Sequence, residues 1–348
     1  MPSADRSPRV LIARLSAIGD VVLSMPLACA LRDRFPGALI GWVVERPAAP
    51  LLECHEAIDE LFVVPKGWLG SLGEMRRLCR RLRAAQFEIA VDPQSLTKSA
   101  VVGVLSGARR RIGFARPRGR ELAPWLNNER VVAAAPHVVD RQLELLRPLG
   151  VESPAVRFGY GERPEEARAA EAFLGEWGLA AGFAIINPGA SWASKLWPAE
   201  RYAAVARHVA RRWNLPLLIV WGGAAEKALA ERIAGETSGA ARPAPPSTLR
   251  QLASWARRAR LFLSADTGPL HLAAAVGAPC VGLFGPWPAE ECGPYGSGNV
   301  AVQRMRFDGP SRARRRAPPI YMESIHVESV CEACDRVLGR TPVRTSES

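Results

Sequence analysis

The sequence predicts an α/β protein that contains two similar open sheets of parallel strands. Apolar runs of strand length alternate with longer helical stretches from residue 9 to residue 93, and the same alternation returns between residues 183 and 286. Such alternation is typical of strand–helix–strand units, in which consecutive strands are parallel. With 348 residues, the chain is also long enough for two domains of ordinary size.

Each expected element follows from its residue types. Val, Ile and Leu dominate the expected strands, whereas Ala, Leu and Arg recur at helical spacing in the expected helices. The first series comprises strands at 9–15, 39–45, 60–64 and 87–93, with helices at 24–35 and 74–85. The second comprises strands at 183–189, 215–223, 261–266 and 280–286, with helices at 198–213, 226–236 and 249–259. We expect a linker with one helix at 151–181 and a stiff proline-rich loop at 241–247.

The stretch SADTGPLHLAAAVGAPCVGLFGP at 264–286 combines an acid, a hydroxyl, a glycine and a histidine between a strand and a helix. Asp266 and Thr267 suit the cap of a helix that starts near Pro269, and capping alone is one explanation of both. His271 would then lie in the first turn, beside backbone N–H groups without a partner in the helix. Because ligands bind at the carboxyl edge of parallel sheets, this turn predicts a site for a phosphate or another oxyanion.

Two further loops follow expected strands. Residues 16–20 contain a glycine for a tight turn and Asp20 at the start of the next helix, where an acid also serves as a helix cap. Residues 187–198 are mostly small and contain Lys195, so backbone N–H groups and one point charge can approach a phosphate. The chain has no G-x-G-x-x-G after its first strand, no P-loop motif and no D-x-D pair. These absences argue against a dinucleotide site, a P-loop nucleotidase and a metal held by paired aspartates.

The chain carries a formal net charge of +12, with 42 arginines and only four lysines. Nucleic acid, an anionic membrane face or an acidic substrate would each account for this charge, as would a solvated surface with a bias toward arginine. The basic clusters lack interleaved aromatic residues, which disfavours nucleic acid. The N-terminus has no secretory signal pattern and no apolar run reaches the length of a membrane span, so we expect a cytoplasmic protein. We expect the seven cysteines to be free thiols, including Cys331 and Cys334 in a lone C-x-x-C.

Three stretches of the chain carry a family resemblance. They are RVLIARLSAIGDVVLSMPLACALR near the N-terminus, NPGASWASKLWPAERY in the middle and the stretch at 264–286. Together they resemble the ADP-heptose:lipopolysaccharide heptosyltransferases of glycosyltransferase family 9, and WVVE, DPQSLTKSA and HVVDR resemble the heptosyltransferase I branch in particular. The resemblance implies a GT-B fold, in which the carboxyl edges of two Rossmann-like domains face each other across a cleft. It implies an acceptor domain at 1–165, a nucleotide-sugar domain at 166–325, and a C-terminal helix and tail at 326–348, with the helix packing back on the first domain.

The resemblance also implies roles for individual residues. Asp20 matches the proposed catalytic base, and Lys195 matches the catalytic lysine that contacts the donor diphosphate. The other donor-binding residues that it implies are Ser191, Glu226, Asp266, Thr267, Gly268 and His271. The basic residues that it places toward the acidic acceptor are Lys98, Arg120 and Arg141. The segment 309–323 has no counterpart in the family pattern, and we expect its arginines at 314–316 to associate with an anionic membrane surface.

The implied activity is transfer of L-glycero-D-manno-heptose from ADP-heptose to the Kdo–lipid A inner core of lipopolysaccharide, with inversion. A carboxylate takes the proton of the acceptor hydroxyl, while the lysine and the helix N-terminus stabilise the departing ADP, so we expect no metal or other cofactor. A related glycosyltransferase with another nucleotide sugar or glycan acceptor is the alternative. A binding module without catalysis is disfavoured because both Asp20 and Lys195 are present. We expect a monomer that binds no nucleic acid and associates with the inner face of the cytoplasmic membrane.

Overall fold

The computed structural model describes residues 7–340, which divide into two compact units between Gly161 and Glu162. This border lies close to the expected domain border at 165. Glu162 belongs to the second unit because its carboxylate forms an ion pair with Arg258, at 2.7 Å, on a helix of that unit. Each unit is described below by itself.

The described part of the first unit, residues 7–161, contains one sheet of six parallel strands in the order β3-β2-β1-β4-β5-β6. Its strands are β1 (Arg9–Ala13), β2 (Leu39–Glu45), β3 (Glu60–Val64), β4 (Ile89–Asp92), β5 (Arg110–Phe114) and β6 (Glu129–Val131). Its α-helices are α1 (Ile18–Val22), α2 (Met25–Arg34), α3 (Ala49–Leu52), α4 (Leu72–Ala84), α5 (Thr97–Ser106), α6 (Ala123–Leu126) and α7 (Val138–Leu143). Its 3-10 helices are η1 (Arg46–Ala48), η2 (Trp68–Gly70) and η3 (Glu144–Leu149).

The described part of the second unit, residues 162–340, also contains six parallel strands, in the order β12-β11-β10-β7-β8-β9. Its strands are β7 (Ala184–Asn187), β8 (Leu217–Ile219), β9 (Ala241–Pro243), β10 (Leu261–Ala265), β11 (Cys280–Phe284) and β12 (Val300–Gln303). Its α-helices are α8 (Pro164–Glu176), α9 (Ala199–Trp213), α10 (Ala224–Gly235), α11 (Leu249–Arg258), α12 (Gly268–Ala275), α13 (Ala289–Cys292), α14 (Ile320–Glu323) and α15 (Val327–Arg340). Its 3-10 helices are η4 (Ala193–Lys195) and η5 (Ser311–Arg316).

Both sheets have the Rossmann strand order, in which the first strand of the unit lies beside the fourth at the centre of the sheet. The chain builds one half of the sheet outward from β1 and the other half outward from β4. In the second unit, β7 and β10 form the corresponding central pair. Ligands of open α/β sheets bind beyond the carboxyl ends of such a pair. The predicted α/β class with two Rossmann-like sheets is confirmed.

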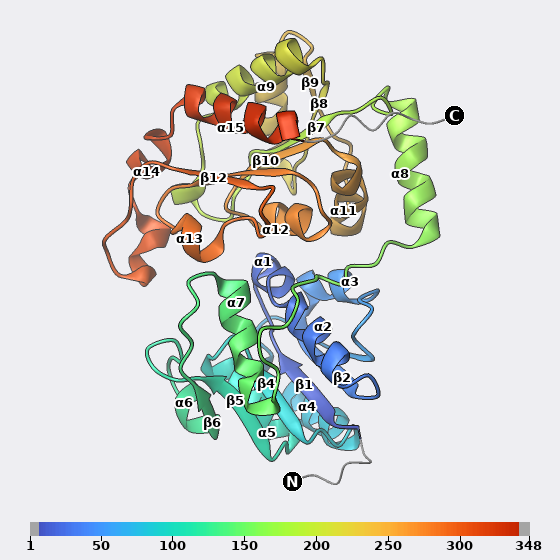
Figure 1. Ribbon diagram of the computed structural model, residues 1–348, viewed down its shortest axis with the longest axis vertical. Helices are drawn as coiled ribbons and strands as arrows, with labels where there is room; N and C mark the ends of the chain where they lie inside the picture. Colours follow the sequence, from blue (N-terminus) through green and yellow to red (C-terminus); the bar gives the residue numbers. More distant parts are fainter. Residues whose placement is uncertain (1–6, 341–348) are drawn as a thin grey trace. The chain divides into compact units, whose positions relative to one another are not determined.

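Helices cover both faces of each sheet (Figure 1). In the first unit, α4 and α5 pack over one face around Leu11, Val43 and Phe62, while α2 and α7 contact each other on the other side. In the second unit, α9 and α15 pack over one face around Ile186 and Leu263, and α11 and α12 lie on the other. Because these layers bury both faces, the loops at the strand ends carry the accessible functional side chains.

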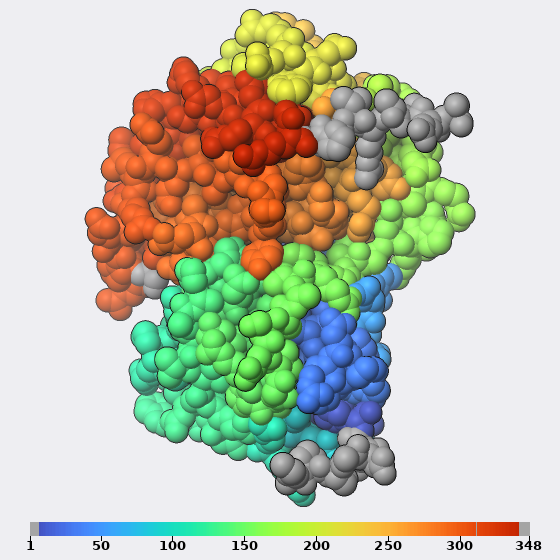
Figure 2. Space-filling model, in the orientation of Figure 1, coloured from blue at the N-terminus to red at the C-terminus, as the bar shows by residue number. Residues whose placement is uncertain are grey.

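The C-terminal helix α15 packs on the second unit, whereas the family resemblance implied packing on the first. Val330 and Ala333 lie in the same buried core as the apolar face of α9. Asp335 of α15 also accepts a hydrogen bond from Trp213 Nε1 at the end of α9, at 2.6 Å. In Figure 2, α15 (red) adjoins the yellow surface of the preceding helices of this unit. The tail at 341–348 lies outside the described residues.

Two segments differ from their sequence-based interpretation. The proline-rich stretch at 241–247 begins with β9, an edge strand, where a proline is tolerated because one side of the strand needs no hydrogen-bond partner. The arginines at 109–111 form one of the basic clusters of the sequence. Arg110 and Arg111 are the first two residues of β5, and Arg110 Nε forms an ion pair with Glu129 on β6, at 2.6 Å. Part of this basic cluster therefore belongs to the sheet.

The cysteines and the hydropathy of the helices agree with a core of ordinary side chains. All seven cysteines are free, as expected, and Cys334 is buried in the core of the second unit. Within residues 7–340, no helix combines the length and the apolar character that a membrane span requires.

Candidate active site

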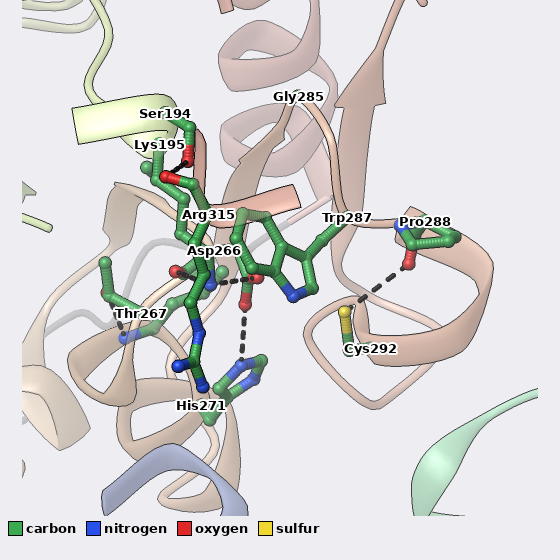
Figure 3. Close-up of polar contacts among 12 residues, drawn as sticks. Ser194, Lys195, Asp266, Thr267, His271, Gly285, Trp287, Pro288, Cys292 and Arg315 are labelled. Carbon is green, nitrogen blue, oxygen red and sulfur yellow. Dashed lines mark hydrogen bonds and ion pairs between the residues drawn. The ribbon is translucent and has the colours of Figure 1, made fainter. Parts of the chain in front are cut away.

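Lys195 and Asp266 form an ion pair at the carboxyl edge of the second sheet (Figure 3). Lys195 ends η4 in the loop after β7, and Asp266 directly follows β10. The Lys195 ammonium lies 2.6 Å from Asp266 Oδ2 and donates a second hydrogen bond to the Asp266 carbonyl oxygen, at 3.0 Å. It also lies 4.1 Å from the ring centroid of Trp287. Three contacts thus fix the only charge on this loop, and the Lys195–Asp266 pair by itself is neutral.

His271 is the third member of this cluster. Its Nε2 lies 3.1 Å from the other carboxylate oxygen of Asp266, Oδ1. Burial raises the pKa of Asp266, but the hydrogen bond with His271 and the charge of Lys195 outweigh it, so the pKa of Asp266 falls below its usual value. His271 is 5% exposed, and its Nδ1 is buried without a hydrogen-bond partner among the described residues. A buried ring nitrogen without a hydrogen-bond partner is uncommon in folded proteins.

Thr267 and Gly268 begin α12 beside this cluster. Thr267 is the N-cap, and its Oγ1 accepts a hydrogen bond from the Leu270 N–H, at 3.4 Å. The capping role considered for Asp266 and Thr267 therefore applies to Thr267, while Asp266 pairs with Lys195. Since Pro269 has no N–H and the Leu270 N–H is used, Gly268 supplies the N–H of the first turn. The helix start offers fewer N–H groups than the sequence suggested.

Glu226 and Gly189 meet over the loop that follows β7. Glu226 lies in the first turn of α10, and its Oε2 accepts a hydrogen bond from the Gly222 N–H, at 2.7 Å. A Cβ at Gly189 would lie 2.3 Å from Glu226 Cδ, so glycine lets the carboxylate keep this position against the loop. Ser191 is exposed two residues further along the same loop. The predicted donor-binding residues thus share one edge of the second sheet.

Asp20 lies at the matching edge of the first sheet. It is the third residue of α1 rather than its cap, and its Oδ2 accepts a hydrogen bond from the Ala17 N–H, at 3.2 Å. Its Oδ1 lies 2.9 Å from Arg14 Nη2, and the Asp20 side chain is 49% exposed whereas that of Arg14 is 8% exposed. Arg14 also donates to the Pro93 carbonyl oxygen, at 3.2 Å, after β4. Asp20 is therefore accessible, with its orientation fixed by a buried arginine at the central strand pair.

Lys98 and Arg120 lie at the same end of the first unit. Lys98 Nζ lies 2.8 Å from Glu45 Oε1, at the end of β2, and 2.6 Å from Ser16 Oγ, after β1. Arg120 is exposed. Hydrogen bonds from Thr97 lower the pKa of Glu121, and the charges of Arg120 and Lys98 act on the same carboxylate. Lys98 and Asp20 thus both lie at the carboxyl edge of the first sheet, and Lys98 is already paired with an acid.

Arg141 occupies a different environment from the one expected for an acceptor-binding residue. It is 6% exposed on α7, and its Nη1 donates hydrogen bonds to the carbonyl oxygens of Pro136, at 2.7 Å, and Ala135, at 3.3 Å. These contacts hold the loop that precedes α7. Its predicted role in acceptor binding remains a prediction.

Comparison with known proteins identifies the family. The model of glycosyltransferase family 9 (heptosyltransferase) matches residues 75–318. The chain belongs to glycosyltransferase family 9. Lipopolysaccharide heptosyltransferase 1 of Pseudomonas aeruginosa is 30% identical over 303 residues, which cover 84% of this chain and 82% of that protein. The protein of the same name in Escherichia coli K12 is 26% identical over 309 residues, which cover 86% of this chain and 94% of that protein.

Solved structures share the fold of this family 9 glycosyltransferase. A glycosyl transferase of family 9 from Veillonella parvula has a TM-score of 0.84 at 23% identity, covering 96% of this chain and 98% of its own. The E. coli heptosyltransferase WaaC with ADP has a TM-score of 0.74 at 24% identity, covering 93% of this chain and 98% of its own. The predicted GT-B fold is confirmed, and the family makes this chain an enzyme that transfers a glycosyl group.

Two residues of the candidate site of this glycosyltransferase were absent from the sequence prediction. Trp287 packs over the Lys195 ammonium and follows the quoted stretch 264–286 directly, so an aromatic residue just after a strand end was the available signal. Arg14 orients Asp20, but in the sequence it is one arginine among many inside an apolar strand. The signal there was a charge within a run otherwise expected to be buried.

Proposed function

We propose that this enzyme transfers L-glycero-D-manno-heptose from ADP-heptose to the Kdo–lipid A inner core of lipopolysaccharide, the reaction of heptosyltransferase I. The observation that carries the proposal is the cluster of Lys195, Asp266 and His271 at the central strand pair of the second sheet. The names of the relatives from P. aeruginosa and E. coli support the heptose and the acceptor. The runner-up is a family member with another nucleotide sugar or glycan acceptor.

The second unit supplies the groups that a nucleotide-sugar donor needs. Lys195 and the Gly268 N–H would contact the diphosphate, because a point charge and a helix N-terminus both favour anionic oxygens. Glu226 would accept hydrogen bonds from the ribose hydroxyls beside Gly189. The solved E. coli protein WaaC was studied with ADP and with ADP-2-deoxy-2-fluoro heptose, which supports an adenine nucleotide as the carrier.

The first unit supplies the base. The acceptor hydroxyl attacks the anomeric carbon, the bond from that carbon to the ADP oxygen breaks, and the hydroxyl proton passes to the Asp20 carboxylate. A single displacement of this kind inverts the anomeric centre. Arg14 holds the Asp20 carboxylate through Oδ1. The accessible side chain of Asp20 therefore has a defined orientation. The growing charge on ADP is stabilised by Lys195 and the start of α12.

We propose that no metal ion is required, because these cationic groups perform the stabilisation that a metal would provide. Transfer is then expected to persist in EDTA, and loss of activity in EDTA with recovery in magnesium would contradict this part of the proposal. For the acceptor, we propose that Lys98 and Arg120 contact its acidic groups, and that the basic chain works as a monomer at the inner face of the cytoplasmic membrane.

The proposal is tested with purified enzyme and a panel of nucleotide sugars. ADP-heptose, ADP-glucose, GDP-mannose and UDP-glucose are each incubated with Kdo–lipid A, and transfer is followed by mass spectrometry. We expect transfer from ADP-heptose at a rate at least tenfold above the others. A parallel reaction uses Kdo–lipid A that already carries one heptose. Preference for that second acceptor would contradict the heptosyltransferase I reaction, and preference for another donor would favour the runner-up.

A further inference from the structure

The match of the family model at 75–318 extends over the basic segment Ser311–Arg316, for which the sequence resemblance gave no counterpart. This segment folds as η5 directly against the loop at 187–198 that carries Lys195, called the donor loop below. η5 contacts η4, the short helix that carries Lys195. The Oγ of Ser194 donates a hydrogen bond to the Arg315 carbonyl oxygen, at 3.2 Å, and Ser194 is buried. Lys195 is the next residue along the chain, so this hydrogen bond holds the backbone of Arg315 against the donor loop.

The side chain of Arg315 is also held on this loop. Its guanidinium carbon lies 4.4 Å from the ring centroid of Trp192, a contact that is typical of arginine stacked on an aromatic face. In the view of Figure 3, the side chain extends from the Ser194 contact past Asp266 in the direction of His271. Arg315 itself is exposed, and within residues 7–340 it forms no ion pair. Its charge is therefore available to a ligand of this loop.

The charge balance of the site favours a further cation at this position. Asp266 lies 2.6 Å from the Lys195 ammonium, so the pair contributes no net positive charge. The diphosphate of a nucleotide sugar carries more than one negative charge, so a further cation beside this pair and the helix N-terminus would add to its stabilisation. The Nδ1 of His271 is also buried without a partner among the described residues, so the cluster contains a polar atom that its own side chains leave unsatisfied. Arg315, whose carbonyl oxygen is bonded to Ser194 next to Lys195, would supply a second cation near these groups.

We propose that Arg315 binds the donor diphosphate from the η5 side, with Trp192 positioning its guanidinium. The proposal rests on the donor site assigned above, and it gives η5 a role in donor binding in place of the membrane role expected from its charge. A guanidinium suits this task because its parallel N–H groups match two phosphate oxygens at once.

Calorimetric titration with ADP and with adenosine tests this inference. The Arg315→Ala variant is expected to bind ADP at least tenfold more weakly than wild type, with adenosine affinity unchanged, because only ADP carries the diphosphate. Arg316→Ala is the matched control, since it removes the same charge from the next residue of the same exposed helix. It is expected to bind both ligands as wild type does. A Trp192→Ala variant is expected to lose part of the ADP affinity that Arg315→Ala loses.

Lys195→Ala separates this inference from the donor-site assignment. Weakened ADP binding in Lys195→Ala, together with normal binding in Arg315→Ala, would overturn the role of Arg315 and leave the donor site in place. Normal ADP binding in both variants would overturn both. Association with vesicles of anionic phospholipid is measured in parallel. Equal loss of vesicle association in the Arg315 and Arg316 variants, with ADP affinity intact, would assign the segment to a membrane surface and overturn the inference.

Discussion

Gly189 is expected to control donor affinity through Glu226 without contributing much to stability. In Gly189→Ala, the added Cβ would lie 2.3 Å from Glu226 Cδ and 2.4 and 2.6 Å from its two carboxylate oxygens. These distances are too short for atoms that are not bonded to each other, so the Glu226 carboxylate must move away. It then gives up the hydrogen bond from the Gly222 N–H, which is 2.7 Å long. The backbone of Gly189 itself is not in a left-handed conformation, so alanine adds no backbone strain there.

The size of the effect follows from the hydrogen bonds involved. Glu226 is half-buried, and its carboxylate lies at the end of a flexible side chain. Displacement of this carboxylate is therefore expected to reduce the free energy of unfolding by only about 1 kcal/mol. A hydrogen bond from a ribose hydroxyl to a carboxylate contributes about 1.5–3 kcal/mol to binding, so its loss weakens ADP binding by roughly ten- to a hundredfold. The expected loss of binding free energy therefore exceeds the expected loss of stability.

Calorimetry with ADP on Gly189→Ala, Glu226→Ala and the double variant measures this coupling. We expect each single variant to lose a similar amount of affinity and the double variant to lose little more, because both changes remove the same contact. Gly175→Ala is the control, since a Cβ there meets no atom within 4 Å. Normal ADP affinity in Gly189→Ala alongside weak binding in Glu226→Ala would refute the reasoning, and so would fully additive losses.

Three further predictions concern the charged groups. The pKa of Asp266 is lowered in the folded protein, so its carboxylate stabilises the fold above the unfolded pKa of about 3.9. This contribution is lost as the pH falls below that value. In urea unfolding between about pH 7 and 3, the free energy of unfolding of Asp266→Asn should therefore fall less steeply toward acid than that of wild type. Arg14→Met should reduce kcat by about tenfold or more at unchanged ADP affinity, because Asp20 loses its orientation, and a normal kcat would remove Arg14 from the account. Lys98→Ala should raise the apparent KM for Kdo–lipid A by about tenfold, whereas an unchanged KM would mean that Lys98 only pairs with Glu45.

The sequence was sufficient for the fold class and for the loops that carry the site. The alternation of strands and helices predicted both sheets, and the placement of Asp20, Lys195 and Asp266 after apolar strands predicted the edges at which they lie. These predictions succeeded because they depend on local periodicity and on a general property of parallel sheets. β5 was harder to recognise because Arg110 begins it, and its ion-pair partner Glu129 lies on the neighbouring strand β6, 19 positions further along the chain.

Contacts between distant segments could not be read from the sequence. Nothing local indicates that Lys195 pairs with Asp266, which lies 71 positions further along the chain. The packing of α15 depends on which apolar face accepts its apolar stripe, and both units offer such faces. Likewise, the arginines of η5 look like any solvated basic cluster until the hydrogen bond from Ser194 places Arg315 on the donor loop.

Turnover of the Asp20→Asn variant tests the central claim most directly. Asparagine keeps the shape of the side chain and can still accept a hydrogen bond from the Ala17 N–H, but it cannot take a proton from the acceptor hydroxyl. With ADP-heptose and Kdo–lipid A, we expect kcat to fall about a hundredfold or more, while the melting temperature and the ADP affinity stay at their wild-type values. Turnover within a few-fold of wild type would contradict the assignment of Asp20 as the base and the mechanism built on it.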